Sequence, residues 1–289
     1  MISKKKCPAC YAENFRIIAL LDQKRRKRYK EFIELKYGKS LDSWINSIEV
    51  AVANCTICGH CWYKHHPNTI QLQQMYSSAR NLEKALKTDR PKIISRQVKK
   101  LYQFCDQSLT KPSFLDYGSG SGCWAEAAVL KGFKVSAFEP SLKRSGASGS
   151  YELVSNLAQL KKNQKFDIIN LEQVLEHISD PFMALNELRS YCKKNTIIRV
   201  TVPNLLRNPD KFKVWETWPF DGKSVHFLAP FEHLHGFTPR SLDKLLSRAN
   251  YKRINSIYEL RNEPLNYLRS LAANFIPIAD STTRFLKIS

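Results

Sequence analysis

The second half of the chain alternates between short strand-like apolar runs and segments with helical spacing. Residues 113–117 and 133–139 are predicted strands, and the predicted helix 123–131 between them ends at Gly132. A further strand is predicted around 151–154. Strands that alternate with helices indicate a mostly parallel sheet with helices on both faces, and therefore an α/β fold.

The pattern before residue 112 is different. Residues 69–107 have the apolar spacing of helices, with a break at Pro91. The segment before them contains two cysteine pairs and a basic insert. We therefore expect three parts: a small N-terminal module (1–68), a helical linker (69–111) and an α/β domain (112–289).

The chain carries a large positive charge. Its 289 residues include 46 Lys and Arg against 26 Asp and Glu, a formal net charge of +20, and most of this surplus lies before residue 112. Such asymmetry favours an anionic partner, namely a nucleic acid, an anionic membrane surface or a phosphorylated substrate, unless it serves solubility alone. We find no apolar run of about 18 residues and no apolar core of a secretory signal. We therefore expect a cytoplasmic protein with at most peripheral membrane contact.

Two C-x-x-C pairs lie in the N-terminal module. They are Cys7 with Cys10, and Cys55 with Cys58, and Gly59 follows the second pair. Four thiolates in two such pairs can surround a zinc ion tetrahedrally, and the glycine suits a tight turn around it. A redox-active pair is the alternative, but two pairs that bracket one module favour structural zinc.

One detail of this metal site has alternatives in the sequence. Cys58 and Cys61 also form a C-x-x-C pair, and we choose Cys55 and Cys58 because Cys61 begins a segment typical of a strand that leaves the turn. His60, His65 and His66 are alternative ligands, although we expect them to be solvated.

A basic run, Lys24–Lys30, lies between the cysteine pairs and is followed by helical spacing. Such a run could bind phosphates. It could equally be the exposed side of helices that pack on the cysteine module. We slightly prefer the second interpretation, because few aromatic residues interleave with the charges.

A glycine-rich turn follows the strand 113–117. Gly118, Gly120 and Gly122 come after Asp116 at alternate positions, and Glu139 ends the next strand. Glycines let backbone N–H groups approach a ligand, and a carboxylate at the end of the second strand suits two ribose hydroxyls. A NAD site would have its third glycine one residue later, and Asp116 would repel a pyrophosphate. A ligand with ammonium or sulfonium charge fits better, which points to S-adenosylmethionine.

Residues 113–250 resemble class I S-adenosylmethionine-dependent methyltransferases in five segments that follow the family's order. The segments are 114–122 (FLDYGSGSG), 137–140 (AFEP), 166–181 (FDIINLEQVLEHISDP), 197–204 (IIRVTVPN) and 232–246 (EHLHGFTPRSLDKLL). The VLEHI-x-DP portion is the most distinctive and is similar to the branch that modifies small molecules and sugars. The resemblance implies a Rossmann-like fold with a mostly parallel seven-stranded sheet. The cysteine module also resembles zinc knuckles found on some relatives.

The resemblance further implies which residues bind the cofactor. They are Asp116, Tyr117, Gly118, Ser119, Gly120, Glu139, Pro140, Asn156, Leu157, Leu171, Glu172 and Gln173. Asp116 would orient the methionine end, and Glu139 would bind the ribose hydroxyls. For Leu157 and Leu171, packing in the core is an equal alternative.

Methyl transfer is an in-line displacement at a sulfonium centre, so the enzyme mainly aligns the reactants and excludes water. A general base is needed only when the acceptor is a poor nucleophile. His177 and His233 are the candidates, although His177 could instead be a helix-start residue bonded to the backbone. We expect Glu176 to cap a helix or form an ion pair. His235 lies two residues after His233 and should face the opposite way on a strand.

The acceptor is inferred from the family branch rather than from any residue. The aromatic residues at 215, 218 and 220 lie in the segment that shapes the acceptor pocket in relatives, but core packing explains them equally well. We predict a methyltransferase acting on a small-molecule or glycan-linked acceptor, for example a sugar of a surface polysaccharide. We expect this acceptor to be anionic. The alternatives are an RNA methyltransferase that uses the basic module, and a non-catalytic cofactor-binding protein.

Overall fold

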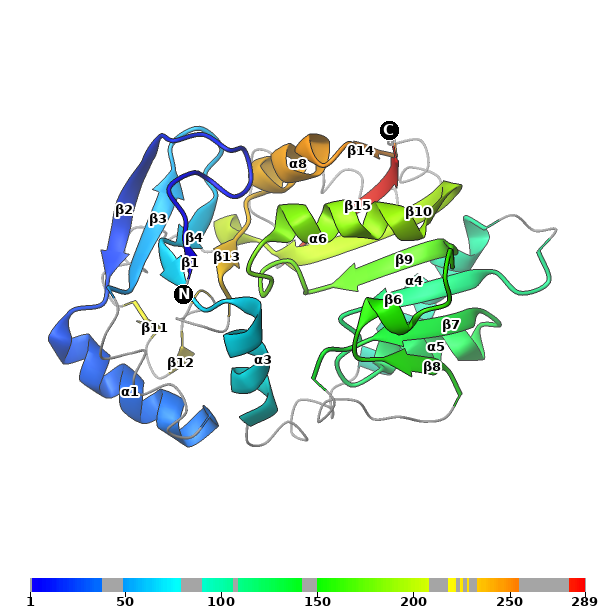
Figure 1. Ribbon diagram of the computed structural model, residues 1–289, viewed down its shortest axis with the longest axis horizontal. Coiled ribbons are helices and arrows are strands. Elements are labelled where there is room, and N and C mark those ends of the chain that lie inside the picture. The colour runs from blue at the N-terminus through cyan, green and yellow to red at the C-terminus, as the bar shows by residue number, and fades with distance from the viewer. Residues whose placement is uncertain are drawn as a thin grey trace.

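The structure of the protein is a computed structural model, shown in Figure 1. It describes residues 2–37, 49–78, 90–105, 109–141, 150–207, 218–221, 224–225, 228, 233–254 and 281–288. Within these residues no helix is both long enough and apolar enough to cross a membrane.

The described part of the chain contains a seven-stranded sheet with the order β14–β15–β10–β9–β6–β7–β8. Its strands are β6 (Ser113–Tyr117), β7 (Lys134–Phe138), β8 (Glu152–Val154), β9 (Phe166–Glu172), β10 (Cys192–Pro203), β14 (Tyr251–Arg253) and β15 (Ser281–Ile288). β6, β7, β8, β9 and β10 pair in parallel, whereas β15 is antiparallel to β10 and to β14. The predicted α/β fold with a mostly parallel sheet is therefore confirmed.

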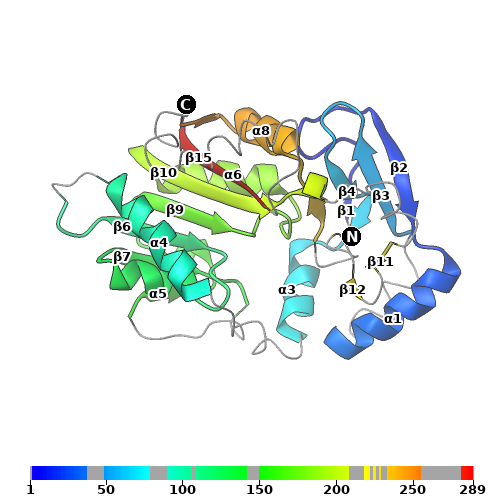
Figure 2. The same cartoon turned by 180° about the vertical axis from the view of Figure 1, so that it is seen from behind.

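Helices cover both faces of this sheet. On one face lies α6 (Pro181–Leu188), which Figure 1 shows in front of β9 and β10. On the other face lie α4 (Arg90–Gln103) and α5 (Cys123–Leu130), as Figure 2 shows. Pro91 lies in the first turn of α4, where a missing N–H is tolerated. α3 (Thr69–Ser78) precedes α4, and the residues between them lie outside the described part.

Local sequence signals explain where these helices begin. Asp180 caps α6 by accepting a hydrogen bond from Met183 N at 3.1 Å, and Pro181 occupies the first turn. α8 (Pro239–Arg248) has a capping box in which Thr238 and Ser241 exchange side-chain and backbone hydrogen bonds. Both helices therefore start at positions that are readable in the sequence.

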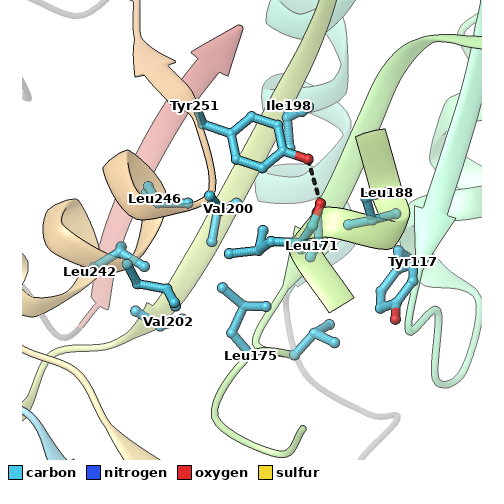
Figure 3. Packing of buried hydrophobic residues seen from close by; sticks show 14 of the residues in the cluster. Tyr117, Leu171, Leu175, Leu188, Ile198, Val200, Val202, Leu242, Leu246 and Tyr251 are labelled. Atoms are coloured by element: carbon cyan, nitrogen blue, oxygen red, sulfur yellow. Dashed lines mark hydrogen bonds between the residues drawn. The ribbon is translucent and has the colours of Figure 1, made fainter. Parts of the chain in front are cut away.

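A hydrophobic layer joins α8 to the sheet. Leu242 and Leu246 of α8 pack over Val200 and Val202 of β10, as Figure 3 shows. The Tyr251 hydroxyl donates a 2.7 Å hydrogen bond to the carbonyl oxygen of Leu185 in α6. This layer holds α8 on the same face of the sheet as α6, and the hydrogen bond of Tyr251 joins the edge strand β14 to α6.

The N-terminal module contains an antiparallel sheet of β2 (Phe15–Leu20), β3 (Ala51–Cys55) and β4 (Cys61–Tyr63). Its fourth strand is β13 (His235–Gly236), which comes from far along the chain and pairs with β4. β4 confirms that Cys61 begins a strand. The remaining short elements are β1 (Ile2–Ser3), β5 (His65–His66), β11 (Phe220–Asp221), β12 (Ser224–Val225) and the 3₁₀ turns η4 (Leu157–Gln159), η5 (Arg189–Tyr191) and η6 (Leu205–Arg207).

The basic run lies on α1 (Gln23–Tyr37), which follows β2 in the module. Two ion pairs hold part of it in place, Arg25 with Asp22 at 3.3 Å and Lys30 with Glu34 at 3.6 Å. Both pairs are local to the helix, so they stabilise it modestly. The basic run and the helical segment predicted after it therefore form one helix.

Candidate functional site

The glycine-rich turn lies between β6 and α5, at the carboxyl end of the parallel strands. Gly118, Gly120 and Gly122 have φ angles of 75°, 54° and 81°, which L-residues rarely adopt. A Cβ atom at Gly118 would lie 2.8 Å from Cγ2 of Val174, whereas a Cβ atom at Gly120 would meet no described residue within 4 Å. The turn is therefore tightly packed on one side and open above Gly120.

Glu139 lies at the end of β7, directly beside this open space. Its carboxylate accepts hydrogen bonds from Gly120 N and from Ser141 N, each at 2.9 Å. The residue is only 6% exposed. A carboxylate has about four acceptor positions, so two remain for further donors such as vicinal hydroxyls.

Asp116 lies below the turn and is 2% exposed. Its Oδ1 accepts a 3.0 Å hydrogen bond from Asn170 Nδ2, and its Oδ2 has no hydrogen-bond partner among the described residues. Burial raises the pKa of this carboxyl to about 7, although the hydrogen bond from Asn170 opposes the shift. A cation above Asp116 would favour its ionised form.

A chain of buried polar groups extends from Asp116 across the sheet. Arg199 of β10 donates to Asn170 Oδ1 at 2.9 Å and forms an ion pair with Glu172. Its guanidinium also lies 4.3 Å from the centroid of the Trp124 ring. The carboxylate of Glu172, a predicted cofactor residue, lies on Arg199 and remains partly exposed.

The other predicted cofactor residues fall into two groups. Tyr117, Leu157 and Leu171 have buried side chains in the core, which matches the alternative weighed for the two leucines. Figure 3 shows Tyr117 beside Leu188, on the side of the sheet that α6 covers. Only the backbone of these three residues is therefore available to a ligand at the turn.

The second group lies at loop positions. Asn156 is exposed, and its side chain caps η4 by accepting from Ala158 N at 2.9 Å. Pro140 is exposed, and Ser119 is half-buried with its N–H bonded to the Phe138 carbonyl at 3.0 Å. Gln173 has a φ of 54°, and its N–H donates to Thr201 O at 2.9 Å.

The two histidines predicted to be catalytic lie together. The ring centroids of His177 and His233 are 4.5 Å apart, with the rings at 71° to each other. Glu176 lies beside them, and its Oε1 is 4.0 Å from His177 Nε2. Glu176 is fully buried, its side chain caps no helix among the described residues, and burial raises the pKa of its carboxyl to about 8. The carboxyl group of Glu176 and the imidazole rings of His177 and His233 therefore lie close together, in the turn that follows β9 and the segment packed on it.

The structure separates His235 from His233. His235 is 1% exposed, and its ring contacts His60, with Nδ1 3.2 Å from His60 Nε2. His60 and His66 are also buried, so the expectation that they are solvated was wrong. Burial lowers the pKa of His60 to about 3 and that of His66 to about 4. These rings are hence neutral packing groups between β4, β5 and β13.

The four predicted zinc ligands form one cluster. Their Sγ atoms all lie within 4.8 Å of one another, with Cys7 and Cys58 3.7 Å apart and Cys10 and Cys55 3.5 Å apart. These separations are too long for disulfides. They match the spacing of about 3.8 Å between sulfur atoms that lie about 2.3 Å from a tetrahedral zinc ion. Cys61 is not in the cluster, and its Sγ accepts a hydrogen bond from Asn54.

The predicted aromatic wall is described only in part. Trp218 is fully buried and donates from Nε1 to Leu228 O at 2.8 Å, and Pro219 is buried beside it. Trp215 lies outside the described residues, as does the side chain of Phe220. Trp218 thus has the core role that was the alternative in the sequence.

Sequence reasoning missed two members of the polar chain, Asn170 and Arg199. Each interrupts an apolar strand, Ile168-Ile169-Asn170-Leu171 and Ile197-Ile198-Arg199-Val200, and both are at least 97% buried. A polar residue inside a strand buried on both faces is a signal of a buried hydrogen-bond network. That signal was present in the sequence.

The sequence was compared with families of known proteins. A family model described as a methyltransferase domain matches residues 71–256, which is well over half of the chain. No curated protein matches the sequence.

Several solved structures are similar to this one. The [4+2]-cyclase SpnF is 16% identical, with 77% of this chain and 97% of that chain covered and a TM-score of 0.50. The plantazolicin methyltransferase BpumL in complex with SAH is 13% identical, with 91% and 99% covered and a TM-score of 0.47. An S-adenosylmethionine-dependent methyltransferase from Clostridium acetobutylicum ATCC 824 is 13% identical, with 71% and 94% covered and a TM-score of 0.47. At such low identity the SpnF comparison concerns the fold alone.

Proposed function

The chain belongs to the family of methyltransferase domains, and from this premise we propose that it transfers the methyl group of S-adenosylmethionine to a small-molecule or glycan-linked acceptor. The observation that carries the choice of cofactor is the pair of carboxylates at the glycine turn. Glu139 accepts a hydrogen bond from Gly120 N, beside a position where a Cβ atom would meet no described residue, and the buried Asp116 ends the strand before the turn. Two carboxylates at this turn suit a ligand with cationic groups and ribose hydroxyls, and disfavour a pyrophosphate.

The residues present fit this cofactor. Glu139 is held by two backbone N–H groups and keeps acceptor capacity for the ribose hydroxyls. The Oδ2 of Asp116 has no hydrogen-bond partner among the described residues, and the cationic methionine end would favour the ionised form of this carboxyl. When bound, S-adenosylmethionine supplies an activated methyl group. The Gly118–Gly120 backbone would lie under it, while Asn156 and the backbone of Leu157 and Leu171 would flank the adenine.

We place the acceptor beside His177 and His233. These two rings lie at the carboxyl end of β9, and Val174 in the same turn contacts Gly118 of the cofactor turn. An acceptor held there would have its nucleophile close to the methyl group. The histidines would promote loss of the acceptor's proton, which a hydroxyl acceptor requires.

We also propose that Cys7, Cys10, Cys55 and Cys58 hold a structural zinc ion. The support is the sulfur spacing of 3.5 Å and 3.7 Å and the burial of Cys7, Cys55 and Cys58. A set of four cysteines leaves no open coordination position, so the ion would fold the module rather than take part in methyl transfer.

Calorimetric titration with S-adenosylmethionine, with NAD as the control, tests the cofactor. We expect binding of S-adenosylmethionine alone, and we expect Glu139→Ala to weaken it by about 1.5–3 kcal/mol, the value of a hydrogen bond to a charged group. Glu187→Ala, which changes an exposed glutamate on α6, is the matched control and should bind normally. Equal binding by Glu139→Ala and the unchanged protein would refute this site.

Methyl transfer from labelled S-adenosylmethionine then tests the acceptor class. We expect label in sugars or other small hydroxyl compounds and none in short RNA at low salt. Labelled RNA would favour the alternative in which the basic α1 binds phosphates. SpnF shows that a similar fold can belong to a protein named as a cyclase, so a product must be identified chemically.

A further inference from the structure

We propose that Glu176, His177 and His233 bind a divalent metal ion, and that this ion holds a hydroxyl oxygen of the acceptor. The role of the ion rests on the proposed methyl transfer, whereas the metal site itself rests only on these three side chains. One ligand atom from each of them lies within 4.8 Å of the other two. No other part of the site described above combines two imidazoles with a carboxylate.

The spacing of the three groups suits a metal ion after small rotamer changes. Glu176 Oε1 and His177 Nε2 are 4.0 Å apart, and the rings of His177 and His233 are 4.5 Å apart between centroids. Ligand atoms about 2.0–2.2 Å from a metal ion are about 3.4 Å from each other in tetrahedral geometry. The side chains therefore have to close by less than about 1.5 Å, which rotation about their χ angles provides.

The carboxylate of Glu176 gives a second reason. The residue is 0% exposed, and neither of its oxygens accepts a hydrogen bond from any described residue. Its one ion-pair partner within 4.0 Å in the described part of the chain is His177. A buried carboxyl without hydrogen bonds is costly to ionise, so it stays protonated unless a cation compensates its charge. A metal ion between Glu176 and the two histidines would supply that charge.

The backbone holds the ligands in this arrangement before any ion binds. The carbonyl oxygen of Glu176 accepts hydrogen bonds from Leu234 N at 2.7 Å and from His235 N at 3.1 Å. These two bonds join the turn after β9 to the segment that carries His233. A site whose ligands come from two joined segments loses little entropy on binding.

The donor set indicates the class of metal and its role. Two imidazoles and one carboxylate suit a first-row divalent cation, and three protein ligands leave positions for water or substrate. An acceptor hydroxyl bound to the ion would lose its proton to water more readily. Its oxygen would then form a bond to the methyl carbon as the carbon–sulfur bond breaks, and the sulfonium would become a neutral thioether.

Titration with Mn²⁺ tests the site without acceptor or cofactor. Binding is measured as the loss of the free-ion signal in electron paramagnetic resonance. Mn²⁺ prefers oxygen and nitrogen ligands over thiolates, so the cysteine cluster should not compete. We expect one ion per chain. Loss of a residue that only hydrogen-bonds a metal ligand weakens metal binding about 10–100-fold. Glu176→Gln and His233→Ala each remove a ligand, so each should weaken Mn²⁺ binding by more than this. His65→Ala and Glu31→Gln remove the same residue types elsewhere and should bind normally.

Binding of S-adenosylmethionine is measured on the same variants as the check of folding. If Glu176→Gln fails to bind the cofactor, the partly exposed His177→Ala replaces it. No Mn²⁺ binding by the unchanged protein, or equal binding by the ligand variants, would overturn the metal site even if the cofactor binds. Mn²⁺ binding without cofactor binding would retain the metal site and contradict the proposed function.

Discussion

Asp116 is the residue whose ionisation should respond most to the cofactor. Its pKa is raised to about 7 because the carboxyl is buried. Between the ordinary value of 3.8 and about 7 the folded protein therefore binds more protons at this residue than the unfolded chain. The contribution of Asp116 to the free energy of unfolding consequently falls as pH rises through this interval.

The first prediction concerns cofactor affinity against pH. A cationic ligand near Asp116 favours the carboxylate, so affinity should rise by up to about tenfold per pH unit below pH 7 and level off above it. Calorimetry in a pH series measures this. Asp116→Asn should bind more weakly and lose this part of the pH dependence. An unchanged pH profile in Asp116→Asn would mean that Asp116 does not face the cation.

The second prediction compares two glycines of the same turn. Gly118→Ala puts a methyl group 2.8 Å from Val174 at a φ of 75°, so overpacking and backbone strain should together cost about 2–4 kcal/mol of unfolding free energy. Gly120→Ala has a φ of 54° and open space, so it should cost only about 1 kcal/mol. Its methyl group would enter the space proposed for the cofactor, and cofactor binding should be lost. Denaturant unfolding and calorimetry separate the two effects. Normal cofactor binding by Gly120→Ala would contradict the proposed position of the ligand.

At the scale of elements, α8 connects the cysteine cluster to the large sheet. Thr238 at its first cap donates from Oγ1 to the Cys58 carbonyl at 3.0 Å. Arg248 in its last turn donates to the carbonyls of Pro8 and Ala9 at 2.7 Å and 2.9 Å. One helix thereby contacts both cysteine pairs while its leucines pack on β10.

The third prediction follows from Arg248. Arg248→Ala should lower the free energy of unfolding by about 2–3 kcal/mol, because it removes two charge-assisted hydrogen bonds and the contact of the guanidinium with Phe182 at 4.0 Å. Arg240→Ala removes an exposed arginine from the other end of α8 and should change little. Chemical denaturation measures both. Equal unfolding free energies of Arg248→Ala and the unchanged protein would show that these contacts of Arg248 contribute nothing to stability.

The elements that the sequence predicted well are those with a local signal. β6 and α5 are separated by glycines, so their positions depend on neighbouring residues only. β13 has two residues and no periodicity of its own, and its partner β4 lies far away in the chain. The burial of His60 and His66 depends on the same distant pairing. Sequence patterns report local preferences, and these features arise from tertiary contacts.

At the scale of the whole molecule, the cysteine cluster and the histidine pair are linked through one segment. β13 pairs with β4, which starts three residues after Cys58, and the residues Leu234 and His235 bond to Glu176. His233 lies immediately before them. A loss of order in the small sheet should therefore displace His233, although the glycine turn lies in another part of the large sheet.

The fourth prediction uses this link. Cys7→Ser removes one of four clustered sulfur atoms, and we expect loss of near-stoichiometric zinc and a lower melting temperature, because zinc bound only in the folded state stabilises that state. Hydrogen exchange should become faster in β3, β4 and β13 and less so in β6 and β7, whose pairing does not involve the module. Cofactor binding should thus persist where the variant remains folded, while methyl transfer falls because His233 is displaced. Cys105→Ser, a buried cysteine outside the cluster, is the control and should retain zinc. Normal zinc content in Cys7→Ser would contradict the zinc site. Faster exchange confined to β3, with β13 unaffected, would show that the cysteine cluster does not hold His233 and that the module has no role on the acceptor side of the site.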